Sequence, residues 1–186
     1  GDNGPVLDDG YQDEAEELVG EHKPAGPYRG WKCSMYEGGT CIPFLLRWSA
    51  VVKPGVSDAF VCQMDLLASL SALVGESYSA RTDSQNTLSA FLGFSQEGRK
   101  ELVMEGILDY AFRQGAWTLI PPYGANQEYE LYNVKEDIGE QHDLAQAMPD
   151  KVKELAAELS DYLRERDAQR PSLKATGEVI PFPDGK

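Results

Sequence analysis

Paired cysteines, long apolar runs and an excess of positive charge are all missing from this 186-residue chain. The three cysteines, Cys33, Cys41 and Cys62, include no C-x-x-C pair and are odd in number, so they predict neither a zinc site nor a disulfide framework. We expect each of them to be a buried packing residue. No apolar run approaches the ~20 residues that span a bilayer, which predicts no membrane span.

Positive charge is scarce, since the chain has 17 Lys and Arg residues but 31 Asp and Glu residues, which gives a net charge of −14. A surface of this sign repels nucleic acids and anionic lipids, so we expect neither as a partner. Acidic residues are dense before the first basic residue, Lys23, which is typical of a solvated loop or helix face. A calcium loop is the alternative, although the ligand spacing of an EF-hand is missing. The acidic run comprises Asp8, Asp9, Asp13, Glu14, Glu16, Glu17 and Glu21.

The first hundred residues mix loop signals with two apolar segments. Residues 1–31 are rich in Gly, Pro and acids, which predicts a loop with one short helix around 14–19. The apolar run 42–48 is typical of a strand buried on both faces. A helix over 66–74 would begin after an N-cap at Asp65 and stop at Gly75.

Residues 101–170 show a different pattern, that of short strands followed by one long helix. We predict strands over 102–104, 110–113, 117–120 and 130–133, with a hairpin turn at Gln114 and Gly115. Pro149 opens an amphipathic helix. Its apolar stripe comprises Val152, Leu155, Ala156, Leu159, Tyr162 and Leu163. A short helix is also expected around 88–92, and an extended tail over 171–186.

These elements predict an α+β protein. Residues 1–100 have the character of the last pieces of a larger α/β domain, and residues 101–170 that of a small antiparallel sheet packed by a C-terminal helix. If the larger sheet is truncated, apolar surface is exposed near 42–48 and 66–74. We expect such surface to promote self-association.

Local motifs carry a resemblance to a known family. Gly1-Asp2-Asn3-Gly4-Pro5 resembles the Asp-Asn-Gly metal motif of sulfatases, which lie within the alkaline phosphatase superfamily. Residues 27–43, with Arg29-Gly30-Trp31-Lys32 and Tyr36-Glu37-Gly38-Gly39, are similar to the family's "RGxK…YEGGxRVP" stretch. Residues 61–67 are similar to "VSQIDLLPTL", and residues 117–144 to "YKLI…ELYDLENDPGEXXNLA". The four matches follow one another in the family's order.

The resemblance implies that Asp2 and Asn3 are two ligands of a calcium (or magnesium) ion, which prefers oxygen donors. An Asx turn is the alternative reading of the same residues. Lys32 matches the sulfate-contacting lysine, which makes it the candidate catalytic and substrate-binding residue, against the alternative of a surface lysine. His22 lies in a stretch similar to some bacterial members and is a candidate substrate contact, against the alternative of a bystander. His142 is expected at the surface.

The motifs contain further residues beside Lys32 whose roles differ from that of a site residue. Arg29 is either a second group near the anion or, as we expect, a structural residue. Glu37, Gly38 and Gly39 are expected to shape the loop rather than to react.

The sulfatase nucleophile is a formylglycine made from Cys or Ser in a C/S-x-P-x-R motif. Cys41-Ile42-Pro43 begins like this motif, but Leu45 stands where Arg belongs, so we reject Cys41 as the nucleophile. We therefore expect the chain to be a C-terminal part of a sulfatase, inactive alone, whose partner is the missing N-terminal domain. The resemblance implies hydrolysis of an aryl or carbohydrate sulfate ester.

Two other functions stay open. One is a phosphodiesterase or phosphonate hydrolase of the same superfamily, and the other is a non-catalytic structural or interaction module. The sequence does not define the compartment, although the resemblance implies a periplasmic or secreted parent protein.

Overall fold

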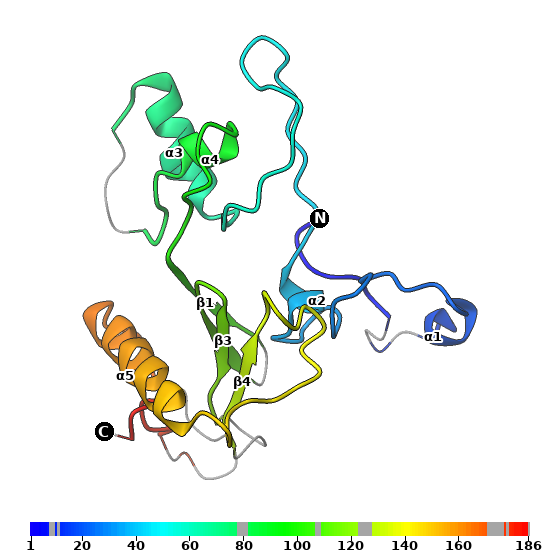
Figure 1. The fold of residues 1–186 in the computed structure, drawn as a ribbon, viewed down its shortest axis with the longest axis vertical. Helices are drawn as coiled ribbons and strands as arrows, with labels where there is room; N and C mark the ends of the chain where they lie inside the picture. The colour runs from blue at the N-terminus through cyan, green and yellow to red at the C-terminus, as the bar shows by residue number, and fades with distance from the viewer. Residues whose placement is uncertain are drawn as a thin grey trace. The chain divides into compact units, whose positions relative to one another are not determined.

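The computed structural model describes residues 1–7, 10, 12–77, 82–106, 109–122, 128–170, 177 and 179–185. Contacts divide the chain into two compact units (Figure 1). The first combines Gly1–Pro43 with Leu102–Lys186, and the second is Phe44–Glu101. The sequence-based division at residues 100 and 170 stays a prediction, because a compact unit is defined by contacts and a domain by independent folding.

The first unit is built on a four-stranded sheet in the order β1-β2-β3-β4. Its strands are β1 Glu101–Glu105, β2 Tyr110–Gln114, β3 Trp117–Ile120 and β4 Glu130–Asn133. β2 and β3 pair antiparallel, as do β3 and β4. The turn between β2 and β3 places Gly115 at φ 56°, a conformation that favours glycine. The predicted strands and hairpin are confirmed.

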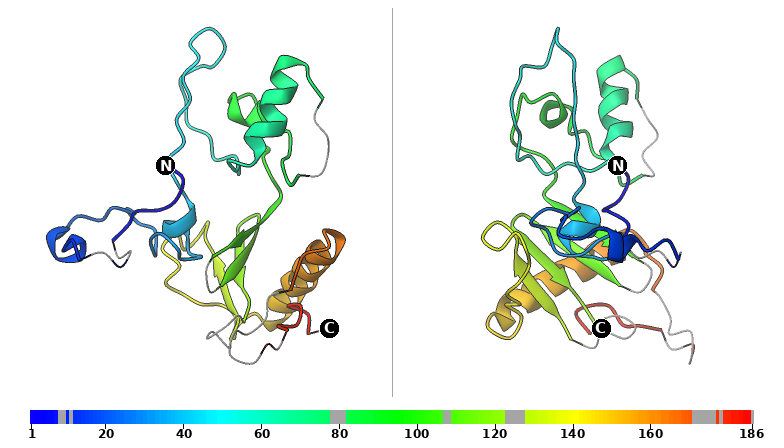
Figure 2. Two further views of the ribbon diagram at one scale, coloured as in Figure 1. Left: turned by 180° about the vertical axis from the view of Figure 1, so that it is seen from behind. Right: turned by 90° about the vertical axis from the view of Figure 1, so that its right-hand side faces the viewer.

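One face of the sheet is covered by helix α5, Pro149–Glu165, which Figure 2 shows lying along it. Leu155 and Leu159 are fully buried in a core with Phe112, Leu119 and Leu131 of the strands. Burial of these side chains stabilises the unit by about 1.5–3 kcal/mol for each large apolar residue. The predicted amphipathic helix is confirmed.

The opposite face of the sheet is covered by the chain around Met35 and Tyr36. Ala111, Ile120 and Tyr132 point to this side, as expected from the alternation of side chains along each strand. Helix α2, Glu37–Thr40, follows directly, although the sequence predicted only a loop at these residues. The short helix α1, Ala15–Leu18, confirms the prediction for 14–19.

The second unit contains helix α3, Asp65–Val74, and the short helix α4, Leu88–Phe91, both as predicted. α3 stops where Gly75 adopts φ 76°. Asp65 is its first residue rather than its N-cap, a position held by Met64, because the Asp65 carboxylate pairs with Arg99 instead of the first-turn N–H groups.

The strand predicted over 42–48 is wrong for the described structure, since these residues form no strand. A strand needs hydrogen bonds from a neighbouring strand, and none of the described strands pairs with this segment. Its apolar side chains are correspondingly exposed: Leu45 by 90% and Phe44 by 50%. The apolar run thus predicted that these side chains are buried, whereas in the described structure most of them are exposed.

The cysteines also differ from expectation. All three are free, but Cys33 and Cys41 are exposed and Cys62 is partly buried, so the prediction that each is buried is wrong. Both exposed thiols lie in or beside the loop that carries the candidate site.

Among the described residues, no helix is long and apolar enough to cross a membrane. The part of the predicted tail at 171–176 lies outside the described residues, whereas residues 179–185 are described and contact α5.

Candidate functional site

The candidate site is built where the N-terminal segment pairs with the loop that leads into α2. The Lys32 amide donates to the Pro5 carbonyl at 2.9 Å, and the Gly4 amide donates to the Gly39 carbonyl at 2.9 Å. A Cβ on Gly4 would lie 1.9 Å from the Gly38 carbonyl oxygen, so only glycine permits this approach. The two motifs that the sequence pointed to separately are therefore joined by backbone hydrogen bonds.

Asp2 and Asn3 precede this pairing directly. Asp2 is exposed and Asn3 is partly buried. The Asn3 amide nitrogen donates to the Gly4 carbonyl at 2.7 Å, and its oxygen accepts no hydrogen bond from the described residues. This geometry leaves one carboxylate and one amide oxygen available to a hard cation.

The oxygens of Asp2 and Asn3 fit a divalent metal in type but not in number. No group of three or more His, Cys, Asp or Glu residues in the described ranges is placed to hold an ion. Calcium binds about 6–8 oxygens, so the two residues supply part of a ligand set.

Lys32 is partly buried, and its ammonium makes no ion pair or hydrogen bond with any described side chain. An ammonium without a protein partner is free to bind an anion, which suits the predicted role. His22 is exposed, and no contact joins its side chain to Asp2, Asn3 or Lys32 in the described part of the chain. His142 is at the surface, as predicted, with its ring beside Asp137.

Arg29 anchors the start of the loop. Its Nη1 donates to the Tyr132 hydroxyl and to the Glu140 carbonyl, both at 3.0 Å. Its guanidinium lies 3.7 Å from the centre of the Tyr36 ring, a cation–π distance. These contacts support the structural role expected for Arg29.

Glu140 anchors the end of the loop. Its side chain is fully buried, and its Oε2 accepts from the Glu37 amide at 2.8 Å. The Glu37 carboxylate pairs in turn with Arg113 of β2. Burial raises the pKa of Glu140 to about 7; the Glu37 amide hydrogen bond and the Arg29 and Arg113 charges oppose this shift, and the Glu37 charge adds to it.

Glu130 completes the support from β4. Its Oε2 accepts hydrogen bonds from the hydroxyls of Tyr36 and Tyr132, at 2.8 and 2.7 Å. Burial and the bond to Glu130 raise the pKa of Tyr36 to about 12, so both hydroxyls keep their protons at neutral pH.

Sequence reasoning did not single out Glu130, Arg113 or Glu140. Glu140 appeared only as the last letter of the run Asp137-Ile138-Gly139-Glu140. The available signal was that this acidic residue falls inside a family-like motif. Its backbone conformation, with φ 48°, is uncommon for a residue with a side chain and was not readable from the sequence.

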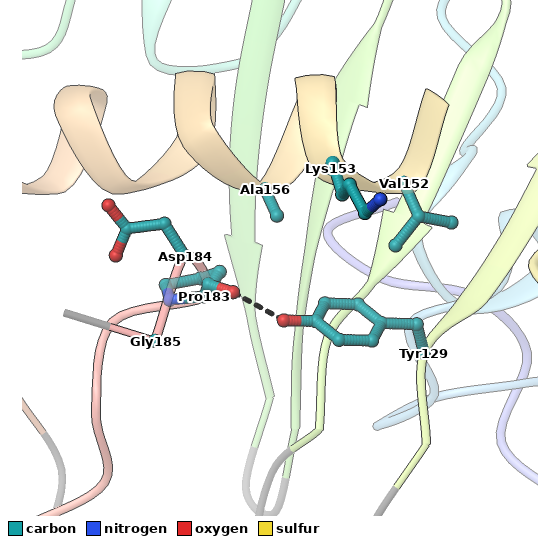
Figure 3. Close-up of a pocket in the computed structure, with 7 residues that line it drawn as sticks. All are labelled: Tyr129, Val152, Lys153, Ala156, Pro183, Asp184 and Gly185. Atoms are coloured by element: carbon teal, nitrogen blue, oxygen red, sulfur yellow. Dashed lines mark hydrogen bonds between the residues drawn. The ribbon is translucent and has the colours of Figure 1, made fainter. Parts of the chain in front are cut away.

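A small hollow lies elsewhere in the first unit, between α5 and the C-terminal segment (Figure 3). It has a volume of about 290 Å³. Val152, Lys153 and Ala156 line it from the helix, and the Tyr129 hydroxyl reaches across to the Pro183 carbonyl. None of the sequence-predicted site residues lines it.

A four-stranded antiparallel sheet with one helix on one face, and with the Asp2–Pro5 segment and the Lys32 loop joined on the first unit, defines the C-terminal subdomain of a sulfatase. As its motifs predicted, the chain matches the C-terminal part of sulfatases. It is 38% identical over 181 residues to an N-acetylgalactosamine-6-O-sulfatase of Bacteroides thetaiotaomicron, a match that covers 89% of this chain and 35% of that protein. An arylsulfatase of Hemicentrotus pulcherrimus is 36% identical over 59 residues, covering 32% of this chain and 11% of that protein.

Solved structures agree with this assignment. A protein from work on the metabolism of multiple glycosaminoglycans by Bacteroides thetaiotaomicron superposes with a TM-score of 0.80 and 36% identity, over 88% of this chain and 37% of that one. Ps i-CgsB in complex with k-i-k-neocarrahexaose superposes with a TM-score of 0.67 and 25% identity, over 80% of this chain and 34% of that one. No family profile matches the chain. The chain thus spans about a third of the length of these relatives.

Proposed function

We propose that this chain is one part of a sulfuric ester hydrolase, and that it supplies one wall of the active site. The single observation that supports this most is the backbone pairing of Lys32 with Pro5 and of Gly4 with Gly39. It joins the segment of the lysine that would contact sulfate to the segment of the residues that would hold a metal.

The chemistry suits these residue types. Hydrolysis of a sulfate ester develops negative charge on oxygen, and the Lys32 ammonium is a compact charge that stabilises it. Asp2 and Asn3 would donate two oxygens to calcium or magnesium, which when bound polarises the sulfate oxygens. The formylglycine nucleophile and the other ligands would come from an N-terminal domain, so the chain alone is inactive.

Exposed apolar side chains in the second unit support a missing partner domain. Leu67 and Leu70 on α3 are 51% and 53% exposed, and Leu45 and Trp48 are 90% and 42% exposed. Large apolar side chains exposed in number often pack against another protein surface. We infer that the N-terminal domain covers some of these side chains.

A carbohydrate sulfate is the favoured substrate class. The relative with 38% identity is named for a sulfated amino sugar, and Ps i-CgsB was solved with an oligosaccharide. An exposed His22 would then be a candidate contact with the sugar rather than with the sulfate. Similarity to sulfatases favours this reading over a phosphodiesterase or phosphonate hydrolase.

The first test is the gene sequence immediately upstream, where a C/S-x-P-x-R motif is expected. The longer protein is then assayed on a sulfated monosaccharide and on the matching phosphate ester. Lys32→Ala should lower kcat/KM on the sulfate by about 100-fold or more, since it removes a charge that faces the transition state. Lys23→Ala, an exposed lysine of the same unit, is the control and should change little. Sulfate turnover that survives Lys32→Ala would contradict the proposal.

The second test addresses the metal. For the isolated chain we expect a melting temperature that millimolar calcium hardly changes, because two ligands are too few. In the longer protein, calcium should raise the melting temperature, and Asp2→Ala should abolish much of that rise while Asp58→Ala leaves it intact. A calcium response that does not depend on Asp2 would remove this residue from the ligand set.

A further inference from the structure

We propose that Glu140 is the positioning residue of the Lys32 loop, and that the charge state of its buried carboxylate regulates how tightly the loop is held. The inference deepens the proposed function and rests on it for the role of Lys32. Its structural basis is one residue that grips both ends of a short segment.

Lys32 lies inside the segment from Arg29 to Glu37. At one end of this segment, the Arg29 guanidinium donates to the Glu140 backbone carbonyl at 3.0 Å. At the other end, the Glu37 amide donates to the Glu140 carboxylate at 2.8 Å. The segment also closes on itself, because the Gly38 amide donates to the Arg29 carbonyl at 2.7 Å.

The Glu140 carboxylate is buried, so its charge state affects the stability of its surroundings. The residue is 0% exposed, and its Oε1 has no hydrogen-bond partner in the described structure. A buried carboxylate oxygen without a partner is costly, which favours the protonated form. A hydrogen bond from an amide to a carboxylate is stronger than one to a neutral carboxyl group, so the Glu37 amide offsets part, but not all, of the cost of burying the ionised form.

Every element packed around Glu140 contributes a charged or polar group. Glu37 comes from α2, Arg29 from the loop and Arg113 from β2, while Tyr132 of β4 and its partner Glu130 lie behind Arg29. The Glu37 amide favours ionisation through its hydrogen bond, the Glu37 charge opposes it, and the two arginines favour it. With burial dominant, the pKa of Glu140 is about 7.

The sign of the effect on stability follows from the raised pKa. Between about pH 4.5 and 7 the folded chain binds a proton at Glu140 that the unfolded chain has lost, so stability falls as the pH rises through this window. Because the loop and α2 contribute to the burial that raises this pKa, docking of the loop follows the same sign and weakens as Glu140 ionises.

The test uses the chain itself, labelled with ¹⁵N and titrated from pH 5 to 9 by NMR. The Glu37 amide signal should shift with a midpoint near 7, and the Glu37 and Gly38 amides should exchange with solvent several-fold faster, per hydroxide ion, above the midpoint than below it. Glu140→Gln should remove the Glu37 titration, and Glu37→Gln should move the midpoint of the Glu140 titration to lower pH. Glu136→Gln, an exposed neighbour, is the matched control.

The inference would be overturned if the Glu37 amide signal did not shift with pH in the unmodified chain. It would also be overturned if the signal shifted in the same way in the Glu140→Gln variant. The unmodified chain gives this answer even if a variant fails to fold. Because no turnover is needed, this result is independent of the Lys32→Ala assay that tests the proposed function.

The second arm measures the longer protein. Glu140→Ala should raise KM for the sulfate ester roughly tenfold with a smaller change in kcat, since it loses one hydrogen bond to the loop. Glu140→Gln should keep most of that binding and flatten the pH dependence of KM around neutrality. If Glu140→Ala and Glu140→Gln raised KM equally at every pH, Glu140 would be a merely structural residue and the positioning role would be overturned.

Discussion

The carboxylate of Asp65 and the guanidinium of Arg99 form an ion pair in the second unit, with 2.5 Å between Oδ1 and Nη1 and with both side chains fully buried. Asp65 also accepts from the Gln85 amide at 2.9 Å, and Arg99 also donates to the Asp83 carbonyl at 3.2 Å. The pair therefore ties the start of α3 to the segment that follows α4.

Asp65→Ala should lower the free energy of unfolding of the second unit by about 3–5 kcal/mol, because it leaves the Arg99 charge buried without its partner. Unfolding in urea, followed by tryptophan fluorescence, measures the loss. Asp58→Ala, an exposed residue of the same unit, should stay within about 0.5 kcal/mol. A loss as small for Asp65 as for Asp58 would show that the pair does not hold this unit together.

Gly38→Ala should disrupt the loop that carries Lys32. A Cβ at this position would lie 2.3 Å from the Gly30 carbonyl oxygen and 2.4 Å from that of Arg29. Because backbone must move to admit it, we expect a loss of about 1–3 kcal/mol in unfolding free energy. Gly55→Ala is the control, since no atom lies within 4 Å of its added carbon. Equal stability of the two variants would contradict the close packing at Gly38.

Leu70→Gln should reduce self-association of the isolated chain. Its side chain is 53% exposed on α3, and its removal from an apolar surface lowers the gain from pairing two such surfaces. Sedimentation velocity across a range of concentrations measures the effect. Leu18→Gln, at 75% exposed on α1, removes a similar side chain from another surface and should change nothing. Identical sedimentation of both variants would place the contact elsewhere.

Asp184→Asn should loosen the C-terminal segment from α5. Both oxygens of Asp184 accept from Arg164 Nη2, at 2.8 and 2.9 Å, and Figure 3 shows Asp184 beside the helix. We expect faster amide exchange at Gly185, whose amide closes the segment by donating to the Phe182 carbonyl. Asp161→Asn is matched, since Asp161 accepts from the same arginine at 3.3 Å and is exposed. If both variants exchange alike, the Asp184 pair does not hold the segment.

Much of the first unit was predictable because its information is local. The short apolar runs of β2 and β3 on either side of Gln114 and Gly115, and the apolar stripe on α5, are local patterns typical of strand and helix. Gly75 likewise marked the end of α3 through a conformation that glycine adopts readily. The resemblance to sulfatases added the family, which no periodicity contains.

What the sequence did not predict depends on contacts between distant parts of the chain. The run at 42–48 is apolar enough for a buried strand, yet burial requires a neighbour that the described structure does not contain. Glu140 is acidic and would ordinarily be read as exposed, but the chain folds it beneath α2. Asp2, Asn3, Lys32 and His22 all stay predictions as site residues.

The hydrogen bonds that hold the Lys32 loop have a consequence for the order of folding. Each strand of the sheet neighbours the next in sequence, so the sheet needs only short loops to close. Arg29 and Glu37, by contrast, reach Glu140 across 111 and 103 residues. Closing such long loops costs entropy before any bond forms, so we expect the sheet to assemble first and the loop to dock last. In a nascent protein, the anion-binding wall would therefore be completed only after the sheet and its following turn have left the ribosome.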